Sequence, residues 1–243
     1  MNPRLLIDAG NTRVKWAVVD AGRWVAQGGG DYADWSGLDG VLAPGMDCFV
    51  ASVAGAGQAG RLAEVLETAG IEPTWLAPSA ECAGVTNSYL TPAQLGVDRW
   101  MGLIGARART RDATLVVSAG TALTVDALTA GGVFLGGVIT PGVGLMRRSL
   151  ADGLARVSQT AGQWQAFPRC TADAVESGIA AALCGAIEQQ YARLASVSSG
   201  PPRCLLGGGD AEMLLPHLGV PAEHAPALVL EGIERVAKES RAE

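Results

Sequence analysis

The chain has 243 residues, of which 49% are hydrophobic, and its 24 acidic side chains outnumber its 18 lysines and arginines to give a formal charge of −6. A chain this apolar can bury a substantial core, which excludes intrinsic disorder. The acidic balance and the scattered arginines argue against a nucleic acid partner, because a phosphate backbone is bound by basic stripes.

No apolar stretch reaches the roughly 20 residues that a membrane-spanning helix requires. The N-terminal sequence MNPRLLIDAGN has a short apolar run followed at once by Asp8, which is unlike a signal peptide. We therefore expect a cytoplasmic protein with no membrane partner. The five cysteines form no Cys-x-x-Cys pair, so we expect buried, reduced thiols rather than disulfides or a zinc site.

The first half of the chain predicts a β-meander followed by a strand, a helix and a strand. Residues 5–28 contain three apolar segments separated by two glycine turns, and residues 47–53 form a further apolar strand. Residues 58–70 have a helical apolar period, with Gly70 suited to the position after the helix end. A short strand begins at Pro73.

The second half repeats this order. Residues 115–137 echo residues 5–28, which predicts two lobes, 1–112 and 113–243, that each open with an antiparallel meander. Chance similarity between two segments rich in glycine and alanine is the alternative. Residues 171–194 predict a long helix with Thr171 as N-cap, and a strand, a glycine turn and a last helix over about 226–240 follow. The pattern predicts an α/β fold with mixed sheets.

One glycine motif is misleading. Residues 55–60 fit G-x-G-x-x-G between a predicted strand and a predicted helix, as a dinucleotide site requires. The next strand, however, ends without the acidic residue that would bind a ribose hydroxyl. The sequence therefore does not favour NAD binding, and no Gly-Lys pair supports a P-loop.

The turn DAGNT at 8–12 is a candidate phosphate cradle. Its small residues allow backbone N–H groups to approach an anion, and Asn11 and Thr12 add side-chain donors. Asp8 could bind magnesium, and Lys15 could reach a β- or γ-phosphate oxygen. An ordinary hairpin turn capped by Asp and Asn explains the motif equally well. A matching turn, Gly120-Thr121-Ala122, favours the phosphate interpretation.

A third glycine cluster, residues 207–209, follows a predicted strand and precedes Asp210. Such a turn before a helix suits the face of a nucleotide or its α-phosphate. Two phosphate turns and an adenosine turn in this order resemble the actin, hexokinase and heat-shock ATPase superfamily. This resemblance implies two similar ribonuclease-H-like lobes, with mixed sheets flanked by helices and an ATP cleft between the lobes.

A further segment, Tyr89 to Trp100, places the Asp98-Arg99 pair at the start of a predicted helix. Together with IDAGNTRVKW, AGTALTVD and GGVITPG, it resembles the type III pantothenate kinases, a family that also bears the name Bvg accessory factor. The resemblance spans nearly the whole chain. It implies phosphorylation of pantothenate by ATP to 4′-phosphopantothenate, the first committed step towards coenzyme A.

The resemblance also implies roles for single residues. Asp98 would be the general base, and Asp8 would hold magnesium. The first ATP-phosphate turn would comprise Asp8, Ala9, Gly10, Asn11, Thr12, Arg13, Val14 and Lys15, and Thr121 would contact ATP in the second turn. Pantothenate would be contacted by Tyr89, Gly96, Val97, Asp98, Arg99 and Thr171. For Arg99 a structural ion pair, and for Thr171 a helix cap, are the alternatives.

This chain departs from the family pattern at Ser118. Many members have an aspartate there that binds an activating monovalent cation, so the loss of its charge weakens the expectation of a potassium or ammonium site. The resemblance and the apolar stripe that begins at Thr171 imply a homodimer. Two alternative functions stay open: an exopolyphosphatase-like hydrolase of the same superfamily, and a non-catalytic regulatory protein that retains the nucleotide fold.

Overall fold

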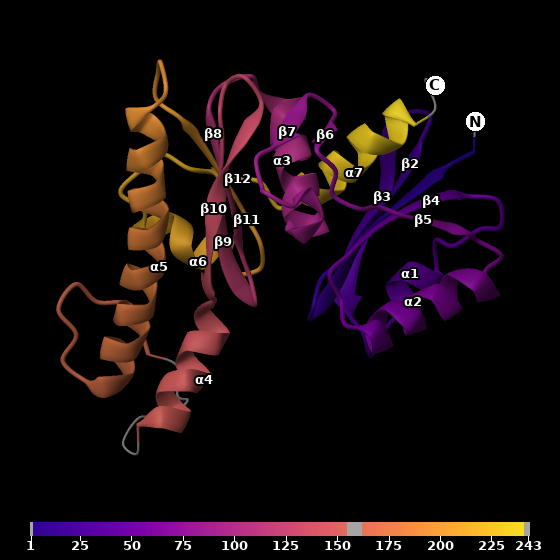
Figure 1. Cartoon of the computed structure of the whole chain (residues 1–243). Helices are drawn as coiled ribbons and strands as arrows, with labels where there is room; N and C mark the ends of the chain where they lie inside the picture. Colours follow the sequence, from indigo (N-terminus) through magenta and orange to yellow (C-terminus); the bar gives the residue numbers. More distant parts are fainter. Residues whose placement is uncertain (1, 155–161, 241–243) are drawn as a thin grey trace. The chain divides into compact units, whose positions relative to one another are not determined.

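The computed structural model describes residues 2–154 and 162–240 (Figure 1). The chain divides into two compact units, Met1–Thr110 with Ala227–Glu243, and Arg111–Pro226. Each unit has a mixed sheet flanked by helices, so the predicted α/β class is confirmed. The C-terminal helix, which the sequence-based division assigned to the second lobe, packs in the first unit.

The first unit has a five-stranded sheet in the order β3-β2-β1-β4-β5. The predicted antiparallel meander is formed by its first three strands, and the last two strands run parallel to β1. The strands are β1 (Arg4–Ala9), β2 (Arg13–Asp20), β3 (Arg23–Asp31), β4 (Asp47–Ser52) and β5 (Pro73–Trp75).

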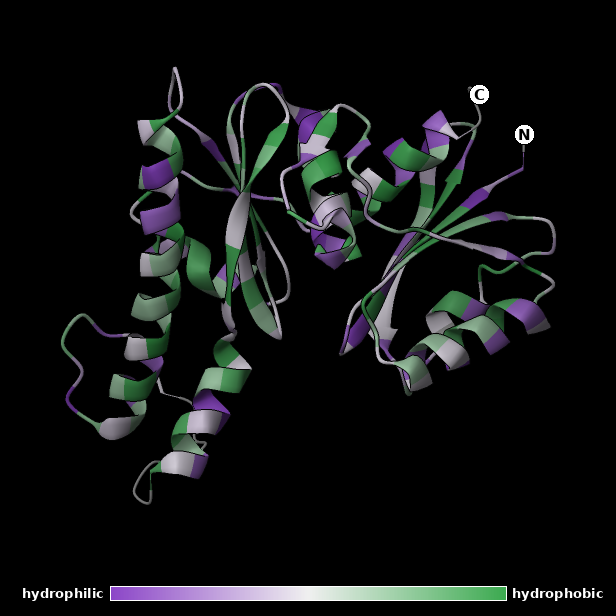
Figure 2. Cartoon of the chain, in the orientation of Figure 1, coloured by the Kyte–Doolittle hydropathy of each residue, from purple (hydrophilic) through white to green (hydrophobic). Residues whose placement is uncertain are grey.

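Helices cover both faces of this sheet: α2 lies against one face, and α3 and α7 lie against the other (Figure 1). Apolar residues dominate the central strands, whereas the helices carry hydrophobic and hydrophilic residues side by side (Figure 2). The remaining elements of the unit are α1 (Ser36–Asp39), α2 (Ala56–Thr68), β6 (Glu81–Cys82), β7 (Val85–Asn87), the 3-10 helix η1 (Pro92–Gln94), α3 (Val97–Arg109) and α7 (Leu228–Glu239).

Helix α2 ends as its sequence predicts. Gly70 has a φ of +68°, in the left-handed region that favours glycine. The N–H of Ile71 donates to the carbonyl of Leu66 at 2.9 Å, and that of Gly70 donates to Glu67 at 2.9 Å. These two bonds form the Schellman arrangement, which satisfies carbonyls at the helix end.

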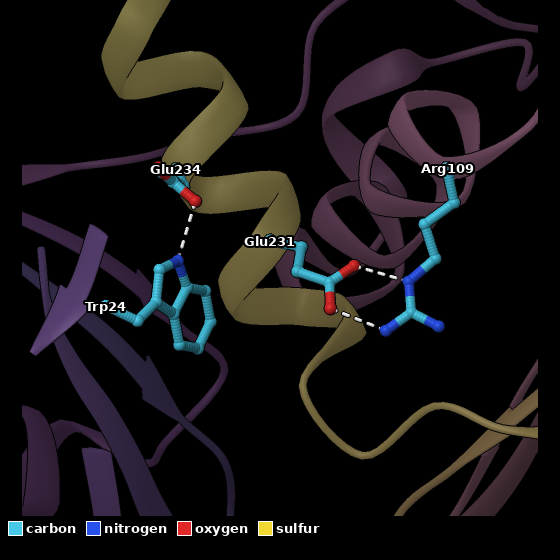
Figure 3. Close-up of polar contacts among 4 residues, drawn as sticks. All are labelled: Trp24, Arg109, Glu231 and Glu234. Carbon is cyan, nitrogen blue, oxygen red and sulfur yellow. Dashed lines mark hydrogen bonds and ion pairs between the residues drawn. The ribbon is translucent and has the colours of Figure 1, made fainter. Parts of the chain in front are cut away.

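The backbones of α3 and α7 approach each other closely because glycines stand at the contact. A Cβ atom at Gly105 would collide with the carbonyl oxygen of Leu228, and one at Gly232 would collide with that of Met101. Figure 3 shows the polar contacts on either side of α7. Glu234 accepts a bond from the indole N–H of Trp24 at 2.8 Å, and Glu231 pairs with Arg109 at 2.5 Å.

The second unit contains the second predicted meander. Its strands lie in the order β12-β11-β8-β9-β10, with β11 and β12 parallel to β8. The long helix α5 packs against this sheet through a core that includes Ile179, Leu183 and Ile187. The elements are β8 (Thr114–Ala119), β9 (Ala122–Leu128), β10 (Val133–Pro141), α4 (Val143–Gly153), α5 (Thr171–Ser196), β11 (Arg203–Gly207), α6 (Ala211–Leu214), the 3-10 helix η2 (Leu215–His217) and β12 (Glu223–His224).

Two expectations from the sequence were wrong in detail. Thr171 is the first helical residue of α5 and not its N-cap; that position belongs to Cys170, whose side chain makes no capping bond. All five cysteines are free, but Cys82 is only half-buried and Cys170 is exposed, so burial of every thiol is not observed. No helix in residues 2–154 and 162–240 is long and apolar enough to cross a bilayer.

The glycine contact between α3 and α7 yields a stability prediction. We expect Gly105→Ala to lower the free energy of unfolding by about 1–3 kcal/mol, because the methyl group would force two backbones apart. A urea titration measures this loss. Gly60→Ala is the matched control: Gly60 is also helical and in the same unit, but nothing lies within 4 Å of its Cβ position, so alanine there should be neutral or stabilise by up to about 1 kcal/mol. Equal midpoints for the two variants would contradict the prediction.

Candidate active site

The first glycine turn joins β1 to β2 and presents its polar residues to solvent. The N–H of Gly10 donates to the carbonyl of Arg13 at 3.0 Å, which closes the turn. Asn11, Thr12 and Arg13 are exposed. Ala9 and Val14 are buried, so their side chains belong to the core and only their backbones could meet a ligand.

Asp8 lies at the end of β1, opposite Lys15 on β2 in the strand register. Burial raises the pKa of Asp8 to about 7; the charge of Lys15 counteracts the increase, and that of Asp98 adds to it. The structure thus brings both Lys15 and Asp98 within electrostatic reach of Asp8, although Asp98 is 90 positions away from it in the sequence.

Asp98 is the second residue of α3, two positions after the N-cap Gly96. Its Oδ1 atom accepts a hydrogen bond from the N–H of Arg99 at 2.8 Å. A Cβ atom at Gly96 would lie 2.6 Å from that same oxygen, so the glycine leaves the space that the carboxylate occupies. Burial raises the pKa of Asp98, while the backbone N–H and the guanidinium of Arg99 oppose the increase.

Arg99 and Tyr89 form a pair beside this carboxylate. The guanidinium of Arg99, which is 8% exposed, donates to the Tyr89 hydroxyl at 3.1 Å and lies 5.8 Å from the centre of its ring. Asn87 fixes the Tyr89 segment, because its side chain accepts from the Tyr89 N–H and donates to the carbonyls of Ser79 and Pro92.

Sequence reasoning did not identify Asn87. Its role depends on partners on both sides of it in the chain, and an asparagine in a short polar segment gives no sign of such contacts. The only available signal was its place two residues before Tyr89; in the structure it is the buried last residue of β7.

The second unit brings its own candidate residues together. Ser118 is exposed in the last residues of β8, and Thr121 is exposed in the turn to β9. The third glycine cluster adjoins this turn, because Asp210 N–H donates to the Ala119 carbonyl at 3.0 Å and a Cβ at Gly208 would strike the Ala119 backbone. Thr171 is exposed at the start of α5.

The donor chemistry limits what metal this chain could hold. Among the residues that the structure describes, no group of three or more His, Cys, Asp or Glu side chains is placed to bind a metal ion. Asp8 nevertheless offers a desolvated carboxylate that a nearby cation would stabilise in its charged form. Magnesium fits this setting, since it commonly takes one or two protein carboxylates and obtains its other ligands from phosphates and water.

Comparison with known proteins identifies the family. The type III pantothenate kinase model matches residues 4–193. A type III pantothenate kinase of Thiobacillus denitrificans is 59% identical, and the match covers 97% of this chain and 96% of that protein. One of Aromatoleum aromaticum is 47% identical, and the match covers 98% of this chain and 99% of that protein.

Solved structures agree on the fold. A Campylobacter jejuni protein described as a Baf family transcriptional activator has a TM-score of 0.61 at 21% identity, covering 98% of this chain and all of its own. A Sinorhizobium meliloti protein described as a 2-dehydro-3-deoxygalactonokinase has a TM-score of 0.60 at 16% identity, covering 98% of this chain and 99% of its own. MreB 5 of Spiroplasma citri has a TM-score of 0.50 at 10% identity, covering 100% of this chain and 98% of its own. The fold is that of the actin, hexokinase and heat-shock ATPases, and the chain belongs to the type III pantothenate kinase family.

Proposed function

We propose that this protein transfers the γ-phosphoryl group of ATP to the primary hydroxyl of pantothenate, giving 4′-phosphopantothenate on the route to coenzyme A. The relatives named as type III pantothenate kinases support the substrate. The structural observation that carries the proposal is the pair of desolvated carboxylates, Asp8 and Asp98, held in one unit.

Asp98 is the proposed general base. It accepts the proton of the pantothenate hydroxyl as the hydroxyl oxygen bonds to the γ-phosphorus, while the bond to the β,γ-bridging oxygen breaks and ADP leaves. A base is most effective when its pKa is near the working pH, and burial moves the pKa of Asp98 in that direction. Bonding to the Arg99 N–H holds the carboxylate in one orientation.

The other acceptor contacts are proposed from their positions around Asp98. Tyr89 and Arg99 form one wall through their mutual hydrogen bond, and Gly96 and Val97 contribute backbone at the start of α3. Thr171 is the proposed pantothenate contact near the boundary of a homodimer, in which α5 would take part. We assign the reaction to the cytoplasm, where ATP is available.

The turn from Asp8 to Lys15 is the proposed site of the ATP phosphates, and Thr121 is the proposed contact in the second turn. The N–H groups of the turn and the charge of Lys15 would neutralise the phosphate oxygens, which is the main requirement of phosphoryl transfer. Asp8 would hold magnesium, which when bound neutralises further phosphate charge. Ser118 offers a neutral hydroxyl to a potassium or ammonium ion, so we propose weak activation by these cations.

A coupled assay of ATP consumption, with and without pantothenate, tests the proposed function. We expect ADP to form only with pantothenate present, together with a phosphorylated product detected by mass spectrometry. Inorganic phosphate released without pantothenate would indicate a phosphohydrolase instead. Nucleotide binding without turnover would indicate a regulatory protein.

Replacing Asp98 tests the base. Asp98→Asn keeps the size and the hydrogen-bonding capacity of the side chain but removes its basicity, so kcat should fall by about 10²–10⁴-fold. Steady-state kinetics and a melting curve on the same preparation measure the effect. The exposed carboxylate of Asp20, in the same unit, supplies the control Asp20→Asn, which should leave kcat unchanged. Turnover of Asp98→Asn within about threefold of wild type would refute the assignment.

The raised pKa of Asp8 predicts how stability depends on pH. Because folding favours the protonated carboxyl, the wild type should lose more stability than Asp8→Asn, which resembles the neutral form, as pH rises from about 4 to about 7. Without ATP and magnesium, the variant should gain up to about 4 kcal/mol relative to wild type over this range. Urea unfolding at several pH values measures the difference. A difference that stays constant from pH 4 to pH 8 would be incompatible with a desolvated Asp8.

A further inference from the structure

Tyr32 makes a direct contact with the first glycine turn. Its hydroxyl donates to the carbonyl oxygen of Gly10 at 2.6 Å, across 22 positions of sequence. The strand register explains this approach. Arg13, which ends the first glycine turn, is opposite Asp31, so Tyr32 is beside that turn. The Asp31 carboxylate also accepts from the N–H of Ala33 at 2.8 Å, which bends the chain at Tyr32.

The surroundings of Tyr32 hold the phenol in one place and keep it protonated. The side chain is 8% exposed, and its ring meets that of Trp35 edge-on at 5.6 Å. Burial, and then the charge of Asp8, raises the pKa of Tyr32 to about 12. The hydroxyl is therefore a hydrogen-bond donor throughout the physiological pH range.

Backbone hydrogen bonds hold both polar groups of the peptide unit that precedes the Gly10 carbonyl. The carbonyl of Ala9 accepts from the N–H of Val53 at 3.0 Å, and the N–H of Gly10 donates to Arg13. The Gly10–Asn11 peptide is the next unit. The bond from the Tyr32 hydroxyl acts on the carbonyl of this unit.

The planarity of the peptide bond transmits this contact to the exposed side of the turn. No peptide bond in the described residues is cis, so the C=O of Gly10 and the N–H of Asn11 point in opposite directions. A carbonyl held towards buried Tyr32 directs the Asn11 N–H away from the core. Asn11 itself is exposed, so an N–H directed away from the core here is accessible to a phosphate.

We infer that Tyr32 is a positioning residue for ATP: its hydroxyl holds the Gly10 carbonyl and thereby directs the Asn11 N–H at a phosphate oxygen of the nucleotide. The inference rests on the proposed function, because it takes this turn as the phosphate site. Tyr32 does not touch the nucleotide and acts only through the Gly10–Asn11 peptide.

Tyr32→Phe tests the inference, because it removes the hydroxyl and keeps the ring. The KM for ATP should rise about three- to tenfold, the range expected for one buried hydrogen bond, while the KM for pantothenate stays unchanged. Tyr191→Phe is the matched control. Its hydroxyl also donates to a backbone carbonyl, that of Pro202 at 2.9 Å, but in the second unit, where Pro202 precedes the end of β11 that is opposite to the end beside Ser118. The control should keep the wild-type KM for ATP.

The kinetic outcomes separate the inference from the proposed function. A wild type that consumes no ATP in response to pantothenate defeats the proposed function. An active wild type with a Tyr32→Phe variant whose KM for ATP is within 1.5-fold of normal overturns the inference alone. Equal increases in both KM values, with a lowered melting temperature, also overturn it, because that pattern shows a purely structural role.

A measurement on the wild type keeps the inference testable if the variant fails to fold. The chain has three asparagines, Asn2, Asn11 and Asn87, so backbone ¹⁵N-asparagine labelling gives three assignable amide signals. Adding magnesium and the non-hydrolysable ATP analogue AMPPNP should shift the Asn11 proton downfield more than the other two. An Asn11 signal that does not respond to the bound analogue overturns the inference.

Discussion

The backbone contact between α3 and α7 is the constraint on which the first unit depends. Gly105 and Gly232 allow the two helices to approach so closely that each glycine faces a carbonyl oxygen of the other helix. Helix α3 carries Asp98 in its first turn, and its position on the sheet decides how near that carboxylate is to Asp8 at the end of β1. Helix packing far from the carboxylates thus sets the electrostatics of the candidate site.

These electrostatics show a conflict between stability and chemistry. Burial disfavours the charged form of both carboxylates, and the charge of Asp98 adds to this effect at Asp8. A structural core would avoid such an arrangement, whereas a site that binds a cation and moves a proton requires it. Part of the cost of burying these charges is offset by Lys15 at Asp8 and by the guanidinium and N–H of Arg99 at Asp98. The part of this cost that is not offset favours the binding of a cation, which would relieve it.

Local patterns predicted much of this fold. Both meanders, the Schellman end of α2 at Gly70 and the start of α3 after Gly96 follow from glycine turns and apolar periods that neighbouring residues define. The approach of Asp98 to Asp8 could be expected only through the family resemblance, since nothing in the local sequence relates positions so far apart. Tyr32 and Asn87 escaped prediction because their contacts depend on register and on loop geometry. The place of α7 was missed because a repeat of 110 residues indicates where the second lobe begins but not which lobe receives the end of the chain.

The position of α7 has a consequence for biosynthesis. The second unit is a continuous stretch, Arg111–Pro226, inserted between the two segments of the first. A ribosome therefore releases the whole of the second unit before α7 emerges, and this unit can fold while the first still lacks a helix. Until then, the face of α3 that receives Leu228 and Gly232 is open to water or to a chaperone. Assembly of the candidate catalytic carboxylates is thus a late event, which cannot be completed before α7 has followed the second unit out of the ribosome.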